Sequence, residues 1–119
     1  MKIDITSATI DPYIPPDPPY LSVWKQIPEI LSRHDAREQM TVAIEELAEL
    51  QKEICKYLRY AGTGKLEPSN YQRIKEELAD AQLMILQLQH ILLINPDDIE
   101  YAMIYKVERL RGRDGGGTE

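Results

Sequence analysis

The sequence has no phenylalanine and only one cysteine among its 119 residues. A single cysteine forms no intrachain disulfide and offers no second thiol to a zinc ion, which favours a protein of the reducing cytoplasm. We expect that residue, Cys55, to be a small buried side chain. Without phenylalanine the core must be built from leucine, isoleucine, alanine and methionine with some tyrosine, a composition that suits helices.

Basic residues are in the minority, with 14 lysines and arginines against 20 aspartates and glutamates and a net charge of -6. This acidity disfavours binding to duplex nucleic acid or to an anionic membrane surface. Long apolar runs are also missing, and no stretch approaches the roughly 18 apolar residues of a membrane span. A single nucleotide remains compatible with an acidic protein, because a divalent cation links carboxylates to phosphates.

The two ends of the chain differ in composition from its middle. Residues 11–20 contain five prolines and predict an extended arm over residues 1–20, which we expect to lie along the body or along a partner subunit. Glycines at the other end predict a flexible tail over residues 112–119. The remaining residues, 21–111, are enough for one domain but hardly for two cores. Residues 61–65, AGTGK, lack the spacing of a phosphate-binding P-loop.

Helical periodicity and capping residues predict an all-α fold. The expected helices span residues 22–31, disturbed at Pro28, and then residues 35–60, 69–94 and 96–112. Asp35 and Ser69 are each followed three residues later by Glu or Gln, as in a capping box. Gly62 marks the end of the second helix, and Asn95 is the expected cap of the last.

Two of these helices carry a similar acidic segment, AIEELAEL at residues 43–50 and IKEELADA at residues 74–81. On the first helix the acids fall on one side, next to an apolar stripe that consists of Ala43, Leu47, Leu50, Ile54 and Leu58. Like charges four residues apart, such as Glu45 and Glu49, each cost about 0.2–0.5 kcal/mol unless a cation compensates. Lysines three residues after these acids compensate the repulsion only modestly, so we expect a further positively charged partner for the acids.

On the second helix Glu77 and Asp80 lie at the edge of the core stripe, which continues through Met84 and Leu88. A carboxylate in such a place is costly unless it is protonated or paired with a cation. Two helices that each offer acids three residues apart suit a shared hard metal, Mg²⁺ or Mn²⁺, far better than zinc. The alternative is an ordinary solvated helix face, which a second copy at the core edge makes harder to sustain.

The compound pattern resembles a known family. Glu45-Glu46-x-x-Glu49, followed after 27 residues by Glu77-x-x-Asp80, resembles the EExxE…ExxD signature of the MazG-like all-α nucleoside triphosphate pyrophosphohydrolases. The resemblance covers about residues 36–111. It implies a four-helix MazG-like bundle, completed by oligomerisation into a homodimer or homotetramer.

The resemblance also implies a function. It predicts Mg²⁺-dependent hydrolysis of a nucleoside or deoxynucleoside triphosphate to the monophosphate and pyrophosphate, with Mn²⁺ as an alternative ion. Glu46, Glu49, Glu77 and Asp80 would ligate the metal. Glu45 would be a further ligand or would orient the attacking water, so that Glu45 and Glu46 are the candidate catalytic residues.

Basic and aromatic residues are candidates for substrate contacts. Lys56 follows Glu49 on the same helix side and is placed to reach a phosphate, with Arg59 slightly off that line. Lys106 and Arg109 form a basic stripe on the last helix, where they would serve either as phosphate contacts or as solubilising charge. Trp24 would stack on a base, although an apolar anchor is the more common role of a lone tryptophan.

Two alternatives to this function remain open at the level of sequence. One is a helical interaction protein that keeps the bundle and performs no chemistry. The other is a pyrophosphohydrolase that acts on a non-standard nucleotide. Metal binding distinguishes the first alternative from the family function, and a panel of nucleotides distinguishes the second.

Overall fold

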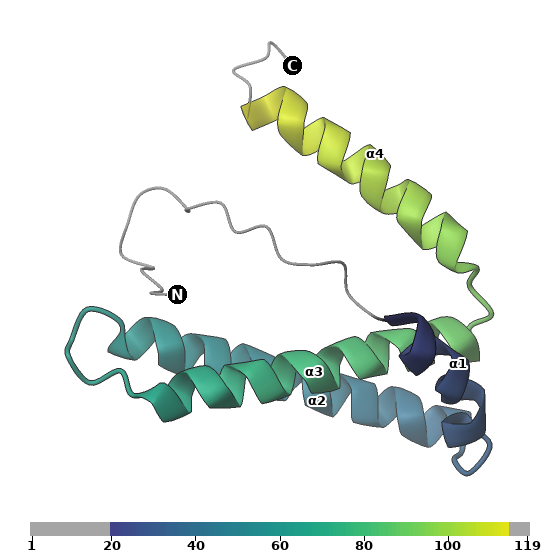
Figure 1. Cartoon of the computed structure of the whole chain (residues 1–119), viewed down its shortest axis with the longest axis horizontal. Helices are drawn as coiled ribbons and strands as arrows, with labels where there is room; N and C mark the ends of the chain where they lie inside the picture. Colours follow the sequence, from purple (N-terminus) through teal and green to yellow (C-terminus); the bar gives the residue numbers. More distant parts are fainter. Residues whose placement is uncertain (1–19, 115–119) are drawn as a thin grey trace. The chain divides into compact units, whose positions relative to one another are not determined.

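The structure, a computed structural model, describes residues 20–114 (Figure 1). These residues form four helices and no strand, which confirms the prediction of an all-α chain. The helices are α1 (Tyr20–Leu31), α2 (Ala36–Tyr60), α3 (Pro68–Ile91) and α4 (Pro96–Asp114). The predicted arm lies outside the described residues except for Tyr20, and so does the predicted tail beyond Asp114. None of the four helices is both long and apolar enough to cross a membrane.

The end of α2 follows the predicted glycine signal. The backbone N–H of Ala61 donates to the carbonyl of Tyr57 at 3.0 Å, and Gly62 then takes a φ of 77°. A residue with a side chain is strained in this left-handed region, so a glycine directly after the last helical turn is the usual solution.

The predicted caps of α2 and α3 are only partly correct. Asp35 occupies the cap position of α2, but its side chain makes no capping hydrogen bond. Ser69 lies inside α3, because the helix already begins at Pro68, whose missing N–H is no loss in a first turn. Glu67 precedes the helix instead, and its backbone N–H donates to Oδ1 of Asn70 in the first turn at 2.9 Å, as in the back-reaching half of a capping box.

The chain divides into two compact units, one up to Leu88 and one from Gln89 onward. In the first unit α2 and α3 run antiparallel to each other, and α1 lies at the end where α2 begins (Figure 1). The apolar residues buried most completely come from all three helices. They are Ile27 (0% exposed), Ala43 (2%), Ala81 (3%) and Met84 (8%).

The face that α2 buries differs from the apolar stripe that the sequence predicts. Ala43 is buried, but Leu47, Ile54 and Leu58 are 36%, 42% and 62% exposed. The buried line runs instead through the acidic side, where Glu53 is only 7% exposed. The buried face of α2 therefore combines part of the predicted stripe, Ala43 and the half-buried Leu50, with the acidic side.

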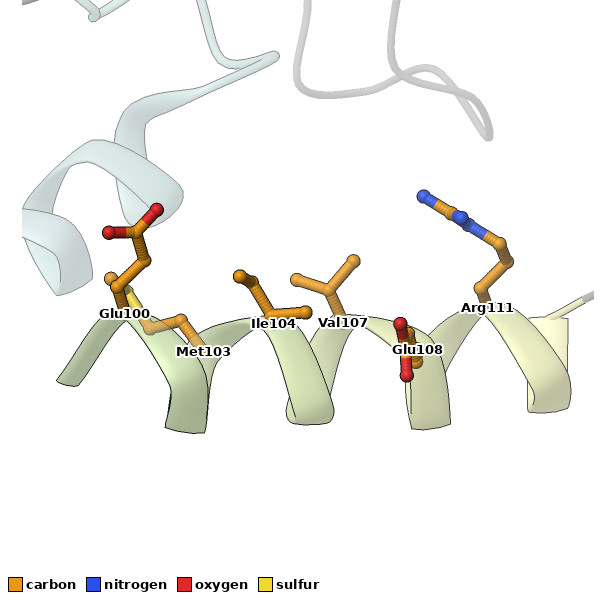
Figure 2. Close-up of a pocket in the computed structure, with 6 residues that line it drawn as sticks. All are labelled: Glu100, Met103, Ile104, Val107, Glu108 and Arg111. Atoms are coloured by element: carbon orange, nitrogen blue, oxygen red, sulfur yellow. The ribbon is translucent and has the colours of Figure 1, made fainter. Parts of the chain in front are cut away.

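In the second unit α4 is a long helix with a well-formed start. Asn95 caps it as predicted, since its Oδ1 accepts a hydrogen bond from the Asp97 N–H at 2.9 Å. Nearly all described side chains of α4 are exposed. Figure 2 shows a shallow pocket along one face of this helix, and α4 alone supplies the residues that line it, which include Met103, Ile104 and Val107.

We predict that Ile27→Ala destabilises the first unit strongly. Ile27 is the largest side chain that is fully buried, and removing its outer carbons leaves a cavity under α1. The expected loss in the free energy of unfolding is about 2–5 kcal/mol. Urea unfolding measures it, with Ile30→Ala as the matched control, because Ile30 lies on the same helix and is 40% exposed. Equal losses for the two variants would contradict this account of the core.

Candidate metal centre

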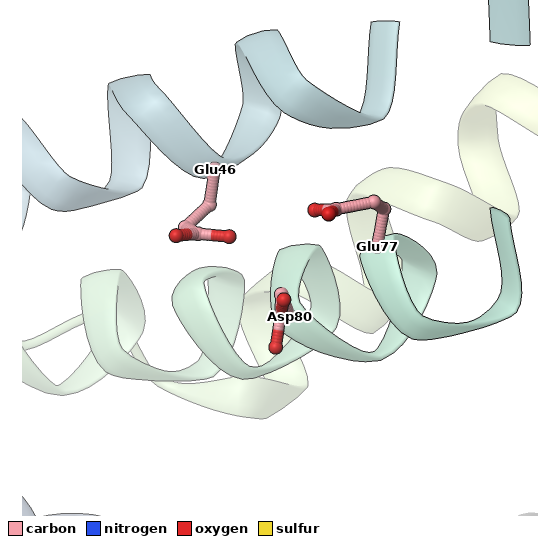
Figure 3. A group of neighbouring side chains, drawn as sticks. All are labelled: Glu46, Glu77 and Asp80. Atoms are coloured by element: carbon pink, nitrogen blue, oxygen red, sulfur yellow. The ribbon is translucent and has the colours of Figure 1, made fainter. Parts of the chain in front are cut away.

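Three acidic side chains converge where α2 faces α3 (Figure 3). Glu46 extends from α2, while Glu77 and Asp80 extend from α3. One carboxylate oxygen of each residue lies within 4.8 Å of one oxygen of each of the others. The spacing of three residues on α3 places Glu77 and Asp80 on neighbouring positions of one helix face, so that both reach toward α2.

The three carboxylates differ in burial. Asp80 is exposed, whereas Glu46 and Glu77 are half-buried. The Oε2 atom of Glu77 is buried and has no hydrogen-bond partner. A buried carboxylate oxygen without a donor is costly, so this atom indicates a missing positive partner.

Glu46 is a weaker acid than an ordinary glutamate. Burial raises the pKa of Glu46 above its usual value of 4.5, and the charge of Asp80 and a hydrogen bond with the Asp80 carboxylate raise it further. Smaller contributions come from the charges of Glu49 and Glu45. The carboxylate of Glu46 is therefore harder to ionise than that of an exposed glutamate, because its charge would lie next to that of Asp80.

The pKa of Glu77 is raised for similar reasons. Burial is the largest cause, followed by the charges of Asp80 and Glu46. Within residues 20–114, the ion pairs of the structure involve Glu29 and Glu53 and none of these three acids. The group therefore has excess negative charge that no neighbouring lysine or arginine neutralises.

The donor set fits a hard divalent cation. It consists of carboxylate oxygens from two helices, without sulfur or imidazole nitrogen, which suits Mg²⁺ or Mn²⁺. A cation would partner the buried Oε2 of Glu77 and offset the repulsion that raises the pKa of Glu46. Water would fill the positions on the exposed side, next to Asp80.

Two further acids of the sequence prediction lie outside this group. Glu45 and Glu49 are both exposed. Glu49 comes three residues after Glu46, which places it about 60° round the helix and about 4.5 Å along it. Its charge still raises the pKa of Glu46 and of Glu77, so it lies close to the group. Its role as a fourth ligand stays a prediction.

The predicted substrate contacts are spread over three helices. Lys56 is half-buried and lies 3.4 Å from Glu53 Oε1, while Arg59 is exposed. Lys106 and Arg109 belong to the second unit, where the Arg109 guanidinium lies over the Tyr105 ring at 5.9 Å from its centre. The phosphate contacts of these four residues stay predictions.

The other aromatic and sulfur predictions have different outcomes. Trp24 is half-buried and lies one turn before the buried Ile27 on α1, as an apolar anchor would. Its stacking on a base stays a prediction. The prediction for Cys55 is wrong, because this residue is exposed. The α2 face that carries Cys55 is turned away from α3, since α2 buries the acidic side that carries Glu53.

The sequence interpretation missed the pair formed by Glu53 and Arg73. The Nε atom of Arg73 on α3 lies 3.5 Å from Glu53 Oε2 on α2. A signal for this pair exists in the spacing, because Glu53 follows Glu46 by seven residues and Arg73 precedes Asp80 by seven. Residues seven apart return to nearly the same helix face.

We predict that Glu77→Gln stabilises the protein at neutral pH when divalent cations are removed. Glu77 has a higher pKa in the folded protein than in the unfolded chain, so raising the pH through these values favours unfolding. Glutamine removes this penalty. Below the ordinary value of 4.5 the carboxyl is protonated in both states, and the advantage of the variant should disappear.

Thermal unfolding with a chelator, from acidic to neutral pH, measures this effect. Glu76→Gln is the matched control, because it removes the same charge from an exposed neighbouring position on α3. Added Mn²⁺ should raise the midpoint of the wild type more at neutral than at acidic pH, and should raise that of Glu77→Gln little. If Glu77→Gln is less stable than the wild type in the chelator at neutral pH, the ionised Glu77 carboxylate does not destabilise the folded protein, and the prediction is wrong.

Comparison of the chain with protein-family models, with curated proteins and with solved structures gave no match.

Proposed function

We propose that this chain is a Mg²⁺-dependent nucleotide pyrophosphohydrolase of the MazG-like all-α type. The convergence of Glu46, Glu77 and Asp80 from two helices is the observation that carries the proposal. Glu46 belongs to the EExxE half of the pattern, on α2, and Glu77 and Asp80 form the ExxD half, on α3. Their carboxylate oxygens lie close together, and none of the ion pairs in residues 20–114 involves them. The all-α chain of four helices is compatible with this assignment.

The proposed reaction is the hydrolysis of a nucleoside or deoxynucleoside triphosphate. Water forms a bond to the α-phosphorus, the bond from that phosphorus to the bridging oxygen breaks, and pyrophosphate leaves with the electron pair. The proton lost by the water goes to a carboxylate base. The products are a nucleoside monophosphate and pyrophosphate, and the nucleotide is assigned on the resemblance of the acidic pattern.

Each acid has a role in this proposal. Glu46, Glu77 and Asp80 hold the cation, and Glu49 joins them from the edge of the group. Glu45, which is exposed beside Glu46, orients the attacking water and accepts its proton. When bound, Mg²⁺ would neutralise charge on the polyphosphate and favour departure of pyrophosphate.

Four basic side chains are proposed to contact the phosphates. Lys56 forms an ion pair with Glu53, and its side chain is 34% exposed. Arg59 lies on the same helix, and Lys106 and Arg109 on α4 are further candidates. Trp24 is the proposed contact for the base.

We also propose that the bundle is completed by self-association into a homodimer or a homotetramer. Large apolar residues stay uncovered in the single chain, on α2 as well as on α4. Examples are Ile44 (70% exposed), Leu58 (62%) and Met103 (55%). Pairing of such surfaces between copies would remove apolar area from water at about 25 cal/mol per Å².

Pyrophosphate release from a panel of nucleotides tests the proposed activity. With Mg²⁺ or Mn²⁺, at least one nucleoside triphosphate, deoxynucleoside triphosphate or modified nucleotide should yield its monophosphate and pyrophosphate. We predict that Glu77→Gln and Asp80→Asn each lower kcat/KM at least about 100-fold, as expected when an electrostatic stabiliser is removed from an active site. Glu76→Gln should retain the activity of the wild type.

Two results would count against the proposal in different ways. Absence of pyrophosphate release by folded protein, together with absence of Mn²⁺ binding, would favour the helical interaction protein. Hydrolysis of modified nucleotides alone would keep the enzyme class and change its substrate. Pyrophosphate release that continues unchanged in Asp80→Asn would place the chemistry elsewhere.

A further inference from the structure

Two polar pairs join α2 to α3 on either side of the acidic group. The Nε2 atom of Gln39 donates a hydrogen bond to Gln87 Oε1 at 2.7 Å. At the other end the Nε atom of Arg73 lies 3.5 Å from Glu53 Oε2, as an ion pair. We call these two contacts the flanking pairs.

The flanking pairs and the acids follow one spacing on both helices. On α2 the positions are 39, 46 and 53, and on α3 they are 87, 80 and 73. Seven residues are about two helical turns, so these positions form one line on each helix. Because the helices are antiparallel, Glu46 and Asp80 are opposite each other midway between the flanking pairs. A shift of either helix by one turn would break both pairs and separate the two acids.

Burial makes such a shift expensive. Gln87 is 6% exposed, and the side chain of Glu53 is 8% exposed, with Lys56 near one oxygen and Arg73 near the other. In a shifted register Gln87 would lose its hydrogen bond to Gln39, and Glu53 would lose the nearby charge of Arg73. The penalty would fall mainly on Gln87, because Glu53 Oε2 has no hydrogen-bond partner in the observed register either and Arg73 is 47% exposed. A buried polar group without a partner costs far more than its hydrogen bond contributes when it is made.

The two buried alanines do little to choose the register. Ala43 and Ala81, which are 2% and 3% exposed, are too small to interlock. The flanking pairs thus favour this register over its neighbours, together with the packing of the larger buried side chains Ile27 and Met84.

We propose that Gln39–Gln87 and Glu53–Arg73 are positioning pairs, which fix the register of α2 against α3 and so hold Glu46, Glu77 and Asp80 ready for a divalent cation. The last step of this inference rests on the proposed metal centre. The register itself is a property of the protein without metal, so the two parts are tested separately.

The first experiment replaces the ion pair in two ways that leave the net charge unchanged. Glu53→Leu/Arg73→Leu removes the polar pairing, whereas Glu53→Gln/Arg73→Gln makes it an amide pair like Gln39–Gln87. The leucine variant should unfold at the same or a higher temperature, because an apolar side chain then replaces the buried Glu53 carboxylate, whose Oε2 has no hydrogen-bond partner, while Arg73 is already 47% exposed. Its Mn²⁺ affinity should nevertheless fall about 10–100-fold, as for lost supporting contacts at metal sites. The glutamine variant should regain most of that affinity.

The second experiment measures the register without metal. Spin labels on the exposed positions Thr41 and Gln82, in a Cys55→Ser background, report the distance between α2 and α3. The wild type and the glutamine variant should give one narrow distance distribution. The leucine variant should add populations in which one helix has moved along the other, by about 10 Å for a shift of seven residues.

Matched controls separate positioning from general effects. Glu29→Leu/Arg33→Leu removes an ion pair whose side chains are 76% and 74% exposed, and it should change neither the distance nor the Mn²⁺ affinity. Gln39→Leu/Gln87→Leu is an independent test at the other flanking pair, and it keeps the inference open to refutation if the first leucine variant does not fold.

Each outcome decides one part of the inference. A single wild-type distance and wild-type Mn²⁺ affinity in both leucine variants would overturn it. Mn²⁺ that fails to bind the wild type would refute the metal centre, and the spin-label distances would then judge the register alone. Equal loss of affinity in the leucine and glutamine variants would show that charge acts there, and the positioning role would be rejected.

Discussion

The structure depends on one unfavourable contact, the approach of like-charged carboxylates from α2 and α3. Burial and mutual repulsion raise the pKa of Glu46 and Glu77, so the folded chain is under electrostatic strain at neutral pH when no cation is present. The rest of the hairpin holds this contact in place. Met84, Ala43 and Ala81 are the buried apolar side chains of the two helices. The flanking pairs at both ends make other registers costly. Perturbed carboxyl pKa values of this kind occur often at functional sites, which is one reason for proposing a cation there.

The helices could be predicted from the sequence because their signals are local. Gly62, Pro68 and Asn95 act on backbone groups within a few residues of themselves, and the ends of α2 and the start of α4 follow from them. The capping contact of α3 was assigned to Ser69 and Gln72, whereas it joins Glu67 and Asn70, because the helix begins one residue earlier, at Pro68. The end of α3 was placed too late, because Leu93 adopts a φ of 56° where a leucine gives no sequence signal for a turn.

The candidate site could be predicted only as a set of acids and not as an arrangement. The spacing of Glu77 and Asp80 fixes their common face within one helix, but the partner on α2 depends on the register between helices, which no local signal specifies. The apolar stripe was expected to face the core, yet Leu47, Ile54 and Leu58 are exposed while Glu53 is buried. Hydrophobicity alone therefore chose the wrong face of α2. The pairing of Glu53 with Arg73 compensates a buried charge that a hydrophobicity pattern counts as unfavourable.

The polar contact between α2 and α3 also has a consequence for stability. A hairpin that buries acids and small alanines gains less from the hydrophobic effect than one that buries leucines, so its folding depends more on what binds to it. A ligand that binds only the folded state stabilises it by about 2.7 kcal/mol at a concentration 100 times its dissociation constant. A cation between Glu46, Glu77 and Asp80 would remove the repulsion and contribute this free energy at the same point. Metal binding and the packing of α2 against α3 would then be thermodynamically coupled, so that each favours the other. The apolar residues that α2 leaves exposed stay available for contacts between copies of the chain.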